Sequence, residues 1–489
     1  MHRSTPYSMT GMLLTFSVTN LLYTLIYIAY GITVLGIIAV ILSENRNPVR
    51  SLAWVTVMLL LPAVGLVLYI FFGRSIKNKH LISRRSRNAL KTQTNAQEID
   101  EDALPFSSES RQQIRLARSL AGVRYYPDNN IQIYTDGASK FQTLERDLNA
   151  AKKYICLQYY IIEDDSLGQQ ISDLLILKAH QGVEVRVIYD GAGSFPVRNS
   201  FFKRMRKNGV KVAPFMRVTF PQLANQINWR NHRKVAVIDG EIGYIGGMNI
   251  ADRYVHGVSY GVWRDTHLRI TGPAVNGLLF SFAIDWKITS GELLNLPVPA
   301  PASSQTGQSG IQIVSSGPTA QWRNIEFLFL KAIGNAHKRI FIQTPYFLPT
   351  ESLLSALQTA ALAKIDVRIM FPRKCDSRML RWASRSYVSE CIQAGIKVYF
   401  YDKGMLHAKT IVIDDEFCSV GSTNFDFRSF EHNFECNAMI YGRRTNEQMA
   451  AIFEADMTHC TRVRPAKWRH RHWTGKVMES IVRLLSPIL

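Results

Sequence analysis

The chain has 489 residues, which predicts two or three domains, and its 47% apolar content supplies enough side chains for sizeable cores. Its 58 lysines and arginines outnumber 38 aspartates and glutamates, and the resulting net charge of +20 indicates an anionic partner, either nucleic acid or a membrane surface. The six cysteines form no CxxC pair. They predict buried free thiols in a reducing compartment and exclude a zinc site of the usual spacing.

Two uncharged segments at the start of the chain predict a transmembrane hairpin. No charged residue lies between Arg3 and Glu44, and a second uncharged run follows after a short polar segment. Each run can cross a hydrocarbon core of ~30 Å, where only a helix satisfies the backbone. The first run is too long for a signal peptide, and a second span follows at once. We expect Pro62 to kink the second helix of a membrane domain at 1–75, with helices at about 19–43 and 51–73.

Basic residues are concentrated after the second uncharged run. The loop between the two runs holds Arg46 and Arg50, offset by Glu44, whereas seven basic residues follow the second run: Arg74, Lys77, Lys79, Arg84, Arg85, Arg87 and Lys91. Because cytoplasmic segments next to a membrane are enriched in Lys and Arg, we expect the loop outside the cell and the rest of the chain in the cytoplasm. The same basic segment is expected to hold anionic lipid.

The remainder of the chain has the texture of an α/β protein. Short apolar runs alternate with segments of helical period, and a Pro/Ser/Gly-rich stretch divides this region in two. The predicted segments are a basic then acidic linker at 76–112, a first lobe at 113–296, an inter-lobe loop at 297–310, a second lobe at 311–460 and a basic amphipathic tail at 461–489.

The tail leaves two interpretations open. It carries seven Lys and Arg residues, and Val477, Ile481 and Leu484 fall at helical spacing near Trp473. This pattern is typical of an amphipathic helix at an anionic membrane surface, and also of a helix packed on the lobes.

The two lobes repeat the same sequence features in the same order. Val183–Ile188 in the first lobe parallels Ile365–Met370 in the second, and His232–Asp239 parallels His407–Asp414. An internal repeat of this length predicts two similar α/β lobes. We expect them to face each other across a pseudo-two-fold axis, which would bring the paired motifs into one site.

Each repeated motif places a histidine, a lysine and an aspartate at fixed spacing. In an extended segment the histidine and the lysine project to one face, because they are two residues apart. The aspartate lies an odd number of positions further on, which directs it to the other face and favours a role in fixing local structure. The motif residues are His232, Lys234 and Asp239 in the first lobe and His407, Lys409 and Asp414 in the second.

These residue types suit the cleavage of a phosphodiester. Two lysines can offset the negative charge that shifts in the transition state. One imidazole can attack phosphorus and form a covalent phosphohistidine, while the other protonates the leaving alkoxide and later accepts a proton from the incoming alcohol. No step requires a metal, and the sequence holds no paired carboxylate cluster that predicts one. We therefore expect neither a metal nor a cofactor.

Further polar residues follow each motif at matching distances. Gly-rich turns that end in Asn249 and Asn424 let the backbone approach a phosphate and place an amide beside it. Asp265 and Glu435 could orient the opposite or the neighbouring histidine by accepting its second N–H. The expected substrate-binding residues are Asn249, Ser422, Asn424, Asp265 and Glu435.

Aromatic pairs end corresponding strands of the two lobes, Tyr159 with Tyr160 and Tyr346 with Phe347. Aromatic residues at strand ends are usually core residues, and the alternative is that they form the wall of a lipid entrance.

The doubled His-x-Lys…Asp motif, followed by Gly-Gly or Gly-Ser and then Asn, resembles that of the phospholipase D superfamily. The second apolar segment, Ser316-Gly-Pro318 and Thr344–Phe347 are similar to those of bacterial cardiolipin synthases, and the resemblance covers nearly the whole chain. One departure is Gly247, where the superfamily often has serine, whereas the second copy keeps Ser422.

The resemblance implies an enzyme of a bacterial inner membrane that condenses two phosphatidylglycerol molecules and releases glycerol, through a phosphatidyl-histidine. It also implies that the two motifs form the catalytic set. Spacing does not decide which histidine is the nucleophile, and family analogy favours His232, with His407 as acid and base.

Three other functions share parts of this pattern. A phospholipase D would use the same site with water as the acceptor. A nuclease of the superfamily would suit the positive charge, although much of that charge lies beside the membrane segments. A catalytically inactive membrane scaffold is disfavoured because both motifs are intact. We expect phosphatidylglycerol and an anionic phospholipid membrane as partners, and no nucleic acid.

Overall fold

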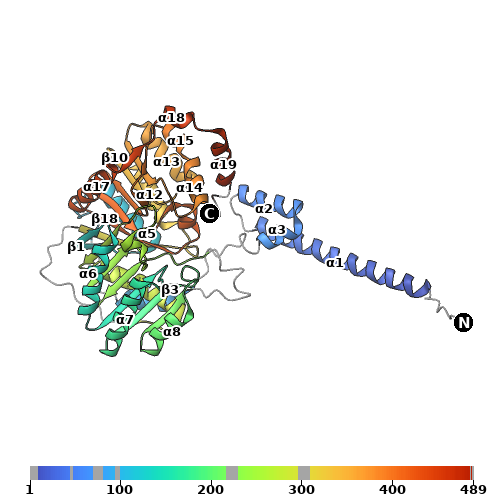
Figure 1. Cartoon of the computed structure of the whole chain (residues 1–489), viewed down its shortest axis with the longest axis horizontal. Helices are drawn as coiled ribbons and strands as arrows, with labels where there is room; N and C mark the ends of the chain where they lie inside the picture. Colours follow the sequence, from blue (N-terminus) through green and yellow to red (C-terminus); the bar gives the residue numbers. More distant parts are fainter. Residues whose placement is uncertain are drawn as a thin grey trace. The chain divides into compact units, whose positions relative to one another are not determined.

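The computed structural model describes residues 9–43, 48–69, 81–93, 100–215, 229–295, 309–484 and 486. These residues form two compact units, an N-terminal helical unit before residue 70 and an α/β unit from residue 81 onward (Figure 1). The helical unit consists of α1 (Met9–Ser43), α2 (Pro48–Leu60) and α3 (Pro62–Leu68). Within α1, the uncharged stretch Asn20–Ala39 is the one described helix that is long and apolar enough to cross a membrane.

The second apolar segment is broken at Leu61. Its backbone leaves the helical region there, with φ −132° and ψ 66°, because Pro62 restricts the residue before it and donates no N–H of its own. The expected helix at 51–73 is therefore two shorter helices, and residues 70–73 lie outside the described residues. The kink expected at Pro62 is a complete break.

The helix α3 folds back along α2. The rings of Trp54 and Tyr69 meet edge to face with centroids 5.4 Å apart, whereas 15 residues of straight helix would separate them by about 22 Å. A side chain at Gly65 would begin 2.9 Å from the carbonyl oxygen of Val57, so glycine permits the close approach. Met58 and Tyr69 are buried together with side chains of α1. The structure thus contains a short helical hairpin where the sequence predicts a single span.

The α/β unit consists of two lobes that share one sheet of 15 strands. The strands of the first lobe are β1 (Tyr126–Tyr134), β2 (Tyr154–Tyr159), β3 (Glu184–Asp190), β4 (Lys211–Phe215), β5 (Val235–Ile238), β6 (Ile242–Gly246), β7 (Val262–Arg264) and β8 (His267–Thr271). The strands of the second lobe are β9 (Ser309–Ser316), β10 (Arg339–Gln343), β11 (Phe347–Leu348), β12 (Asp366–Pro372), β13 (Lys397–Tyr401), β14 (Gly404–Leu406), β15 (Thr410–Ile413), β16 (Phe417–Gly421), β17 (Phe425–Asp426), β18 (Glu435–Tyr441) and β19 (Cys460–Arg462).

The strand order confirms two α/β lobes of the same topology. From the centre outward, the first lobe runs β1-β8-β6-β5-β2-β3-β4 and the second runs β9-β18-β16-β15-β10-β12-β13, with β19 added at its edge. Outside this sheet, β7 pairs with β14 and β11 pairs with β17 in two small sheets of two strands each. The two series match strand for strand, and β1 pairs antiparallel with β9 at the centre. This arrangement is the expected pseudo-two-fold repeat, and the joined sheet fixes the lobes against each other.

Helices cover both faces of each half of the sheet. The helices of the first lobe are α6 (Gly137–Ala150), α7 (Ser166–His180), α8 (Asn199–Lys207), α10 (Arg253–His256) and α11 (Val275–Ser290). Those of the second lobe are α12 (Asn324–Gly334), α13 (Glu351–Leu362), α14 (Arg378–Ser386), α15 (Val388–Gln393), α16 (Phe427–Glu431), α17 (Arg443–Met457), α18 (Pro465–Arg469) and α19 (Trp473–Arg483). In Figure 1 the first lobe lies below the second. The fully buried strands β2 and β15 are apolar throughout or nearly so, as strands covered on both faces must be.

Two further helices precede the first strand, α4 (Arg84–Gln93) and α5 (Ser108–Ala121). Helix α5 spans the expected boundary between linker and first lobe at residue 112, but it packs into the core of the second lobe. Ile114 is fully buried there, and the side chain of Gln113 donates to the carbonyl oxygen of Leu328 at 2.7 Å. Helix α5 precedes the first lobe in the sequence, but in the structure it belongs to the core of the second lobe.

Candidate active site

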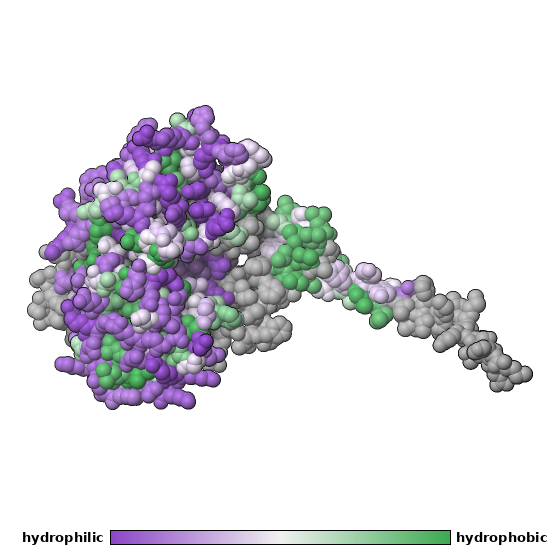
Figure 2. Space-filling view, in the orientation of Figure 1, coloured by the Kyte–Doolittle hydropathy of each residue, from purple (hydrophilic) through white to green (hydrophobic). Residues whose placement is uncertain are grey.

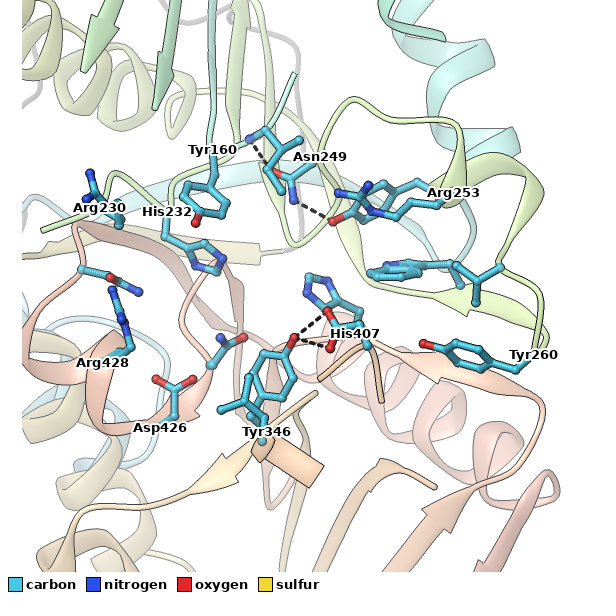
Figure 3. Close-up of a pocket in the computed structure, with 18 of the residues that line it drawn as sticks. Tyr160, Arg230, His232, Asn249, Arg253, Tyr260, Tyr346, His407, Asp426 and Arg428 are labelled. Carbon is cyan, nitrogen blue, oxygen red and sulfur yellow. Dashed lines mark hydrogen bonds between the residues drawn. The ribbon is translucent and has the colours of Figure 1, made fainter. Parts of the chain in front are cut away.

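A pocket of about 880 Å³ is lined by side chains from both lobes (Figure 3). Both motif histidines reach it, each from the extended segment just before a central strand, β5 or β15. The polar lining includes Tyr160, Arg230, His232, Asn249 and Arg253 from the first lobe and Tyr346, Asp376, His407, Asn424, Asp426, Arg428 and Asn433 from the second. The repeat thus brings its two copies together in one site.

Backbone hydrogen bonds between the lobes fix the two histidines. The N–H of His232 donates to the carbonyl oxygen of Phe434 at 2.9 Å, and the N–H of His407 donates to that of Arg264 at 2.6 Å. Each acceptor is the residue just before a buried carboxylate of the opposite lobe. These two hydrogen bonds between the lobes therefore also bring Glu435 and Asp265 close to the histidine side chains.

Each imidazole is held by a carboxylate of the other lobe. Nδ1 of His232 lies 3.1 Å from Oε1 of Glu435, and Nδ1 of His407 lies 2.6 Å from Oδ2 of Asp265. Because a carboxylate accepts, Nδ1 carries the proton and Nε2 keeps its lone pair. Each carboxylate therefore orients the histidine of the opposite lobe, as expected. Both are fully buried behind the rings and do not line the pocket, so the direct substrate contact also expected for them is not present.

The two lysines lie beneath the histidines. Nζ of Lys234 donates to the carbonyl oxygen of His232 at 2.5 Å, and Nζ of Lys409 donates to that of His407. Nζ of Lys409 also lies 2.8 Å from Nδ1 of His407. Both side chains are buried under the imidazoles and neither lines the pocket, whereas direct contact with the phosphate was expected. Burial lowers the pKa of Lys234 well below its usual range.

The motif aspartates, Asp239 and Asp414, lie outside the pocket. Both adopt positive φ, 54° and 49°, at the turns after β5 and β15, a conformation that aspartate tolerates better than most residues. Their carboxylates accept backbone N–H groups at 2.7 to 2.9 Å at the start of the strand beside their own, from Lys152, Lys153 and Tyr154 and from His337, Lys338 and Arg339. They fix the strands that carry the histidines, which is the structural role that strand alternation predicted.

The difference between Gly247 and Ser422 has a physical explanation. The hydroxyl of Ser422 donates to Oε2 of Glu435, so it is engaged with the carboxylate and not with the pocket. A Cβ at Gly247 would lie 2.1 Å from Oδ1 of Asp265. The shorter aspartate therefore occupies the space that the serine side chain fills in the other lobe. Gly247 with Asp265, and Ser422 with Glu435, are therefore two matched pairs, and each pair places a carboxylate behind the histidine of the other lobe.

The expected asparagines differ in their surroundings. Nδ2 of Asn249 donates to the hydroxyl of Tyr254 at 2.6 Å, and its Oδ1 accepts the N–H of Ile161 at 3.1 Å. Both groups of that side chain are therefore engaged within the first lobe. Oδ1 of Asn424 is buried without a hydrogen-bond partner among the described residues, although the side chain lines the pocket.

Several lining residues lay outside the predicted site. Asn433 lines the pocket, and so do the arginines Arg230 and Arg428. Of the strand-end aromatics, Tyr160 and Tyr346 line the pocket, while their neighbours Tyr159 and Phe347 are core residues. Arg230 lies two residues before a motif histidine and Asn433 two residues before Glu435, so proximity to the motifs was the available signal.

Burial controls the protonation of the site. It lowers the pKa of His232 to about 4 and that of His407 to about 4. It also lowers the pKa of Lys409 to about 8. Burial opposes ionisation of Asp265 and Glu435, but the cationic groups beside them outweigh it and hold both carboxyl pKa values below their usual range. Near neutral pH the imidazoles are neutral, the carboxylates are ionised and Lys409 is mostly protonated.

Among the described residues, no group of three or more His, Cys, Asp or Glu side chains is arranged to hold a metal ion. The six cysteines are free thiols, four of them buried.

Comparisons with known proteins agree with this geometry. A family model described as "Cardiolipin synthase, PLD-like domain" matches residues 144–260 and 329–457, one segment in each lobe. A second, described as "Phospholipase_D-nuclease N-terminal", matches residues 31–74. The crystal structure of a phosphatidylserine synthase from Haemophilus influenzae has the same fold, with a TM-score of 0.61 at 14% identity over 77% of this chain and 100% of that one. Fold and site define an enzyme of the phospholipase D superfamily.

Relatives narrow the family further. The chain is 39% identical to a cardiolipin synthase of Halalkalibacterium halodurans, over 94% of this chain and 92% of the relative. It is 38% identical to the major cardiolipin synthase ClsA of Bacillus subtilis, over 97% of this chain and 100% of the relative. The chain belongs to the cardiolipin synthase family.

The matched pairs predict a compensated double substitution. Gly247→Ser should displace Asp265 from His407 and lower kcat, by up to on the order of 10⁴-fold, the loss seen when a histidine loses its orienting carboxylate. Adding Asp265→Glu recreates the Ser–Glu arrangement of the second lobe and should restore at least about tenfold of that loss. Steady-state kinetics of the two single variants and the double variant measure the coupling.

The matched control is Gly334→Ser, because a Cβ there meets no atom within 4 Å. It should leave kcat unchanged. Strictly additive effects of Gly247→Ser and Asp265→Glu would contradict the matched-pair explanation.

Lys409 predicts an upper limit to the active pH range. Its positive charge is present below a pKa of about 8 and is lost as the pH rises through that value. We expect kcat/KM to fall by roughly tenfold per pH unit well above the pKa. Initial rates between about pH 6 and 9.5 measure this, and thermal unfolding over the same range controls for denaturation. A flat profile in a folded protein would remove Lys409 as the titrating group.

Proposed function

We propose that the chain transfers a phosphatidyl group from one phosphatidylglycerol to a hydroxyl of a second, with release of glycerol, as a cardiolipin synthase. The observation that carries the proposal is the pair of imidazoles in one pocket, each held by a carboxylate of the opposite lobe. A phosphodiester exchange in two steps needs one nucleophile and one group that gives and takes a proton. The names of the relatives support a phospholipid as the substrate.

In the first step, Nε2 of one histidine attacks the phosphorus of phosphatidylglycerol. A P–N bond forms and the P–O bond to the glycerol headgroup breaks. The second histidine is protonated at Nε2 when the negative charge of the bound phosphate raises its pKa, and it delivers that proton to the departing oxygen. In the second step, a hydroxyl of another phosphatidylglycerol attacks the phosphorus and gives its proton to the second histidine. The P–N bond breaks and cardiolipin leaves. Lys234 and Lys409 lie beneath the imidazoles, and the positive charge of Lys409 offsets the negative charge of the reacting phosphate.

His232 is assigned as the nucleophile and His407 as the acid and base. The bond from Nδ1 of His407 to Asp265 is 2.6 Å long, shorter than the 3.1 Å that separates His232 from Glu435. A shorter bond to a carboxylate favours the imidazolium that an acid must form. Lys409 opposes this at 2.8 Å from the same nitrogen, and the phosphate of a bound lipid offsets that charge.

Two amide oxygens support a headgroup that carries hydroxyls. Asn424 and Asn433 line the pocket, and Oδ1 of each is buried without a partner among the described residues. The amide N–H of Asn433 already donates to Glu435 at 3.3 Å, so its oxygen is the atom left to interact. Unpaired buried acceptors recognise donors, and the glycerol headgroup of phosphatidylglycerol offers two hydroxyl donors.

The assignment of the histidines predicts which variant traps the intermediate. With phosphatidylglycerol labelled on phosphorus, His407→Ala should accumulate labelled protein that is stable to alkali and labile to acid, because no base then takes the proton of the incoming hydroxyl in the second step. His232→Ala should carry no label, since it lacks the attacking nitrogen. Denaturing electrophoresis followed by autoradiography detects the adduct. Label on His232→Ala and none on His407→Ala would reverse the assignment.

The same labelled reaction separates transfer from hydrolysis. Cardiolipin with an equal amount of free glycerol is the expected product of the unaltered chain. Phosphatidic acid without cardiolipin would instead identify a phospholipase D that uses water.

For the membrane, we propose that the lobes face the cytoplasm of a bacterial cell, as the basic residues after the apolar segments favour. Helix α2 has 13 residues and would span only about 20 Å, and α3 returns along it. The apolar tip is exposed, with Leu59, Leu60 and Leu61 at 64%, 73% and 57%. These features support one crossing by α1 and a hairpin that enters and leaves from the cytoplasmic side.

Cysteine labelling with a membrane-impermeant maleimide distinguishes the two paths. In intact cells, Ser4→Cys should react and Asn47→Cys should react only after the cells are opened. Two complete crossings would give the reverse result at both positions. The unaltered chain, with its six native cysteines, provides the background signal.

A further inference from the structure

The helix α19 turns an apolar stripe outward. Trp473, Val477, Ile481 and Leu484 follow at intervals of four, four and three residues, so they lie on one side of the helix. Their exposed fractions are 67%, 46%, 52% and 80%. A surface helix normally buries its apolar side, and a helix that exposes it has a further partner. Figure 2 shows this stripe as a green patch over α19, at the upper right of the α/β unit.

The opposite side of α19 is fixed to the second lobe. Glu479 is buried and forms a two-pronged ion pair with Arg471, at 2.6 and 3.0 Å. The guanidinium of Arg471 stacks 3.3 Å above the ring of Trp468. Arg483 pairs with Glu390 on α15. The apolar stripe is therefore held rigidly on the lobe.

Helix α14 joins α19 to the pocket. The two helices pack together, and the first turn of α14 supplies Leu380 to the pocket wall. Asp376, just before α14, accepts the hydroxyl of Tyr346 at 2.8 Å inside the pocket. The neighbouring Met379 is 41% exposed. We define the α14–α19 surface as Met379 together with the apolar stripe of α19.

Basic residues outnumber acidic ones on and beside α14 and α19. Glu479, already paired, is the single acidic residue from 461 to the end of the chain. The basic residues on or beside the two helices are Arg378, Arg381, Arg385, Lys467, Arg469, Arg471, Lys476 and Arg483. An exposed tryptophan, aliphatic side chains and flanking arginines and lysines are the composition of a helix that lies in an anionic membrane interface.

We propose that the α14–α19 surface docks on an anionic phospholipid bilayer and holds the pocket against the lipid headgroups. The inference rests on the proposed function, because a bilayer partner matters only if the pocket takes lipid. A phospholipid that leaves the membrane exposes its acyl chains to water, which is unfavourable. A rigid docking surface one helix away from the pocket lets the phosphate reach the histidines while the chains stay in the bilayer.

The kinetic test compares lipid in a bilayer with lipid in solution. The full chain and its Val477→Ser/Ile481→Ser variant are assayed on long-chain phosphatidylglycerol in proteoliposomes and on monomeric dihexanoyl phosphatidylglycerol in detergent. Docking predicts a loss of about tenfold in kcat/KM on vesicles, because two apolar anchors are removed, and a change of less than about twofold on the monomeric lipid. The matched control, Leu362→Ser, alters a leucine that is 63% exposed at the end of α13, and it should change neither rate.

Two kinetic outcomes would overturn the proposal. One is an equal loss on both lipids, which would indicate damage to the site. The other is an unchanged rate on vesicles. If the unaltered chain forms no cardiolipin from either lipid, the proposed function fails instead, and contact with the membrane is then decided separately.

Fluorescence quenching provides that separate decision. Phosphatidylglycerol with brominated acyl chains quenches tryptophans that enter the hydrocarbon region. The full chain in such vesicles should lose more emission than Trp473→Phe, which lacks the exposed indole. Equal quenching of both proteins would overturn the docking. So would a mass in detergent that falls from dimer to monomer in Val477→Ser/Ile481→Ser, because a second copy of the chain would then be the occupant of the surface.

Discussion

Each imidazole of the site depends on a carboxylate that the other lobe supplies. Glu435 holds His232, and Asp265 holds His407, while backbone hydrogen bonds cross between the lobes at the same two places. Neither lobe can orient its own histidine, so the site exists only when the lobes are docked. The single sheet that runs through both lobes, joined where β1 pairs with β9, keeps them docked. The site therefore depends on the reciprocal contacts between the lobes, and the shared sheet maintains those contacts.

The contacts between the lobes, together with burial, also determine the protonation states of the histidines and carboxylates. Burying two imidazoles, two lysines and two carboxylates together would be unfavourable for any one of them alone. Opposed charges and hydrogen bonds keep the carboxylates ionised, whereas burial keeps the imidazoles neutral and lowers the pKa of both histidines to about 4. A neutral ring with its lone pair toward the pocket is ready to attack phosphorus. The protein prepares this state by geometry, before any lipid arrives.

Much of the fold and of the site could be predicted from the sequence, because both depend on local pattern. The internal repeat predicted two matching lobes, and the spacing within each motif predicted that the aspartate would turn away from the histidine. Contacts between distant segments could not be predicted in the same way. The place of Asp265 and Glu435 behind the rings, the inward turn of Lys234 and Lys409, and the packing of α5 on the second lobe all depend on three-dimensional neighbours. The return of α3 along α2 depends on the break before Pro62 and on the close approach that Gly65 permits. A hydropathy profile shows neither of these features.

The contrast between Gly247 with Asp265 and Ser422 with Glu435 has a consequence for the history of the molecule. Each pair lies within one half of the chain, but its carboxylate holds the histidine of the other half, so a change in either pair alters the other half's part of the site. Within each half, a substitution at the glycine or serine position is expected to require a matching substitution at the carboxylate that it contacts. The two halves must therefore evolve together, because neither half has a complete site without the carboxylate of the other.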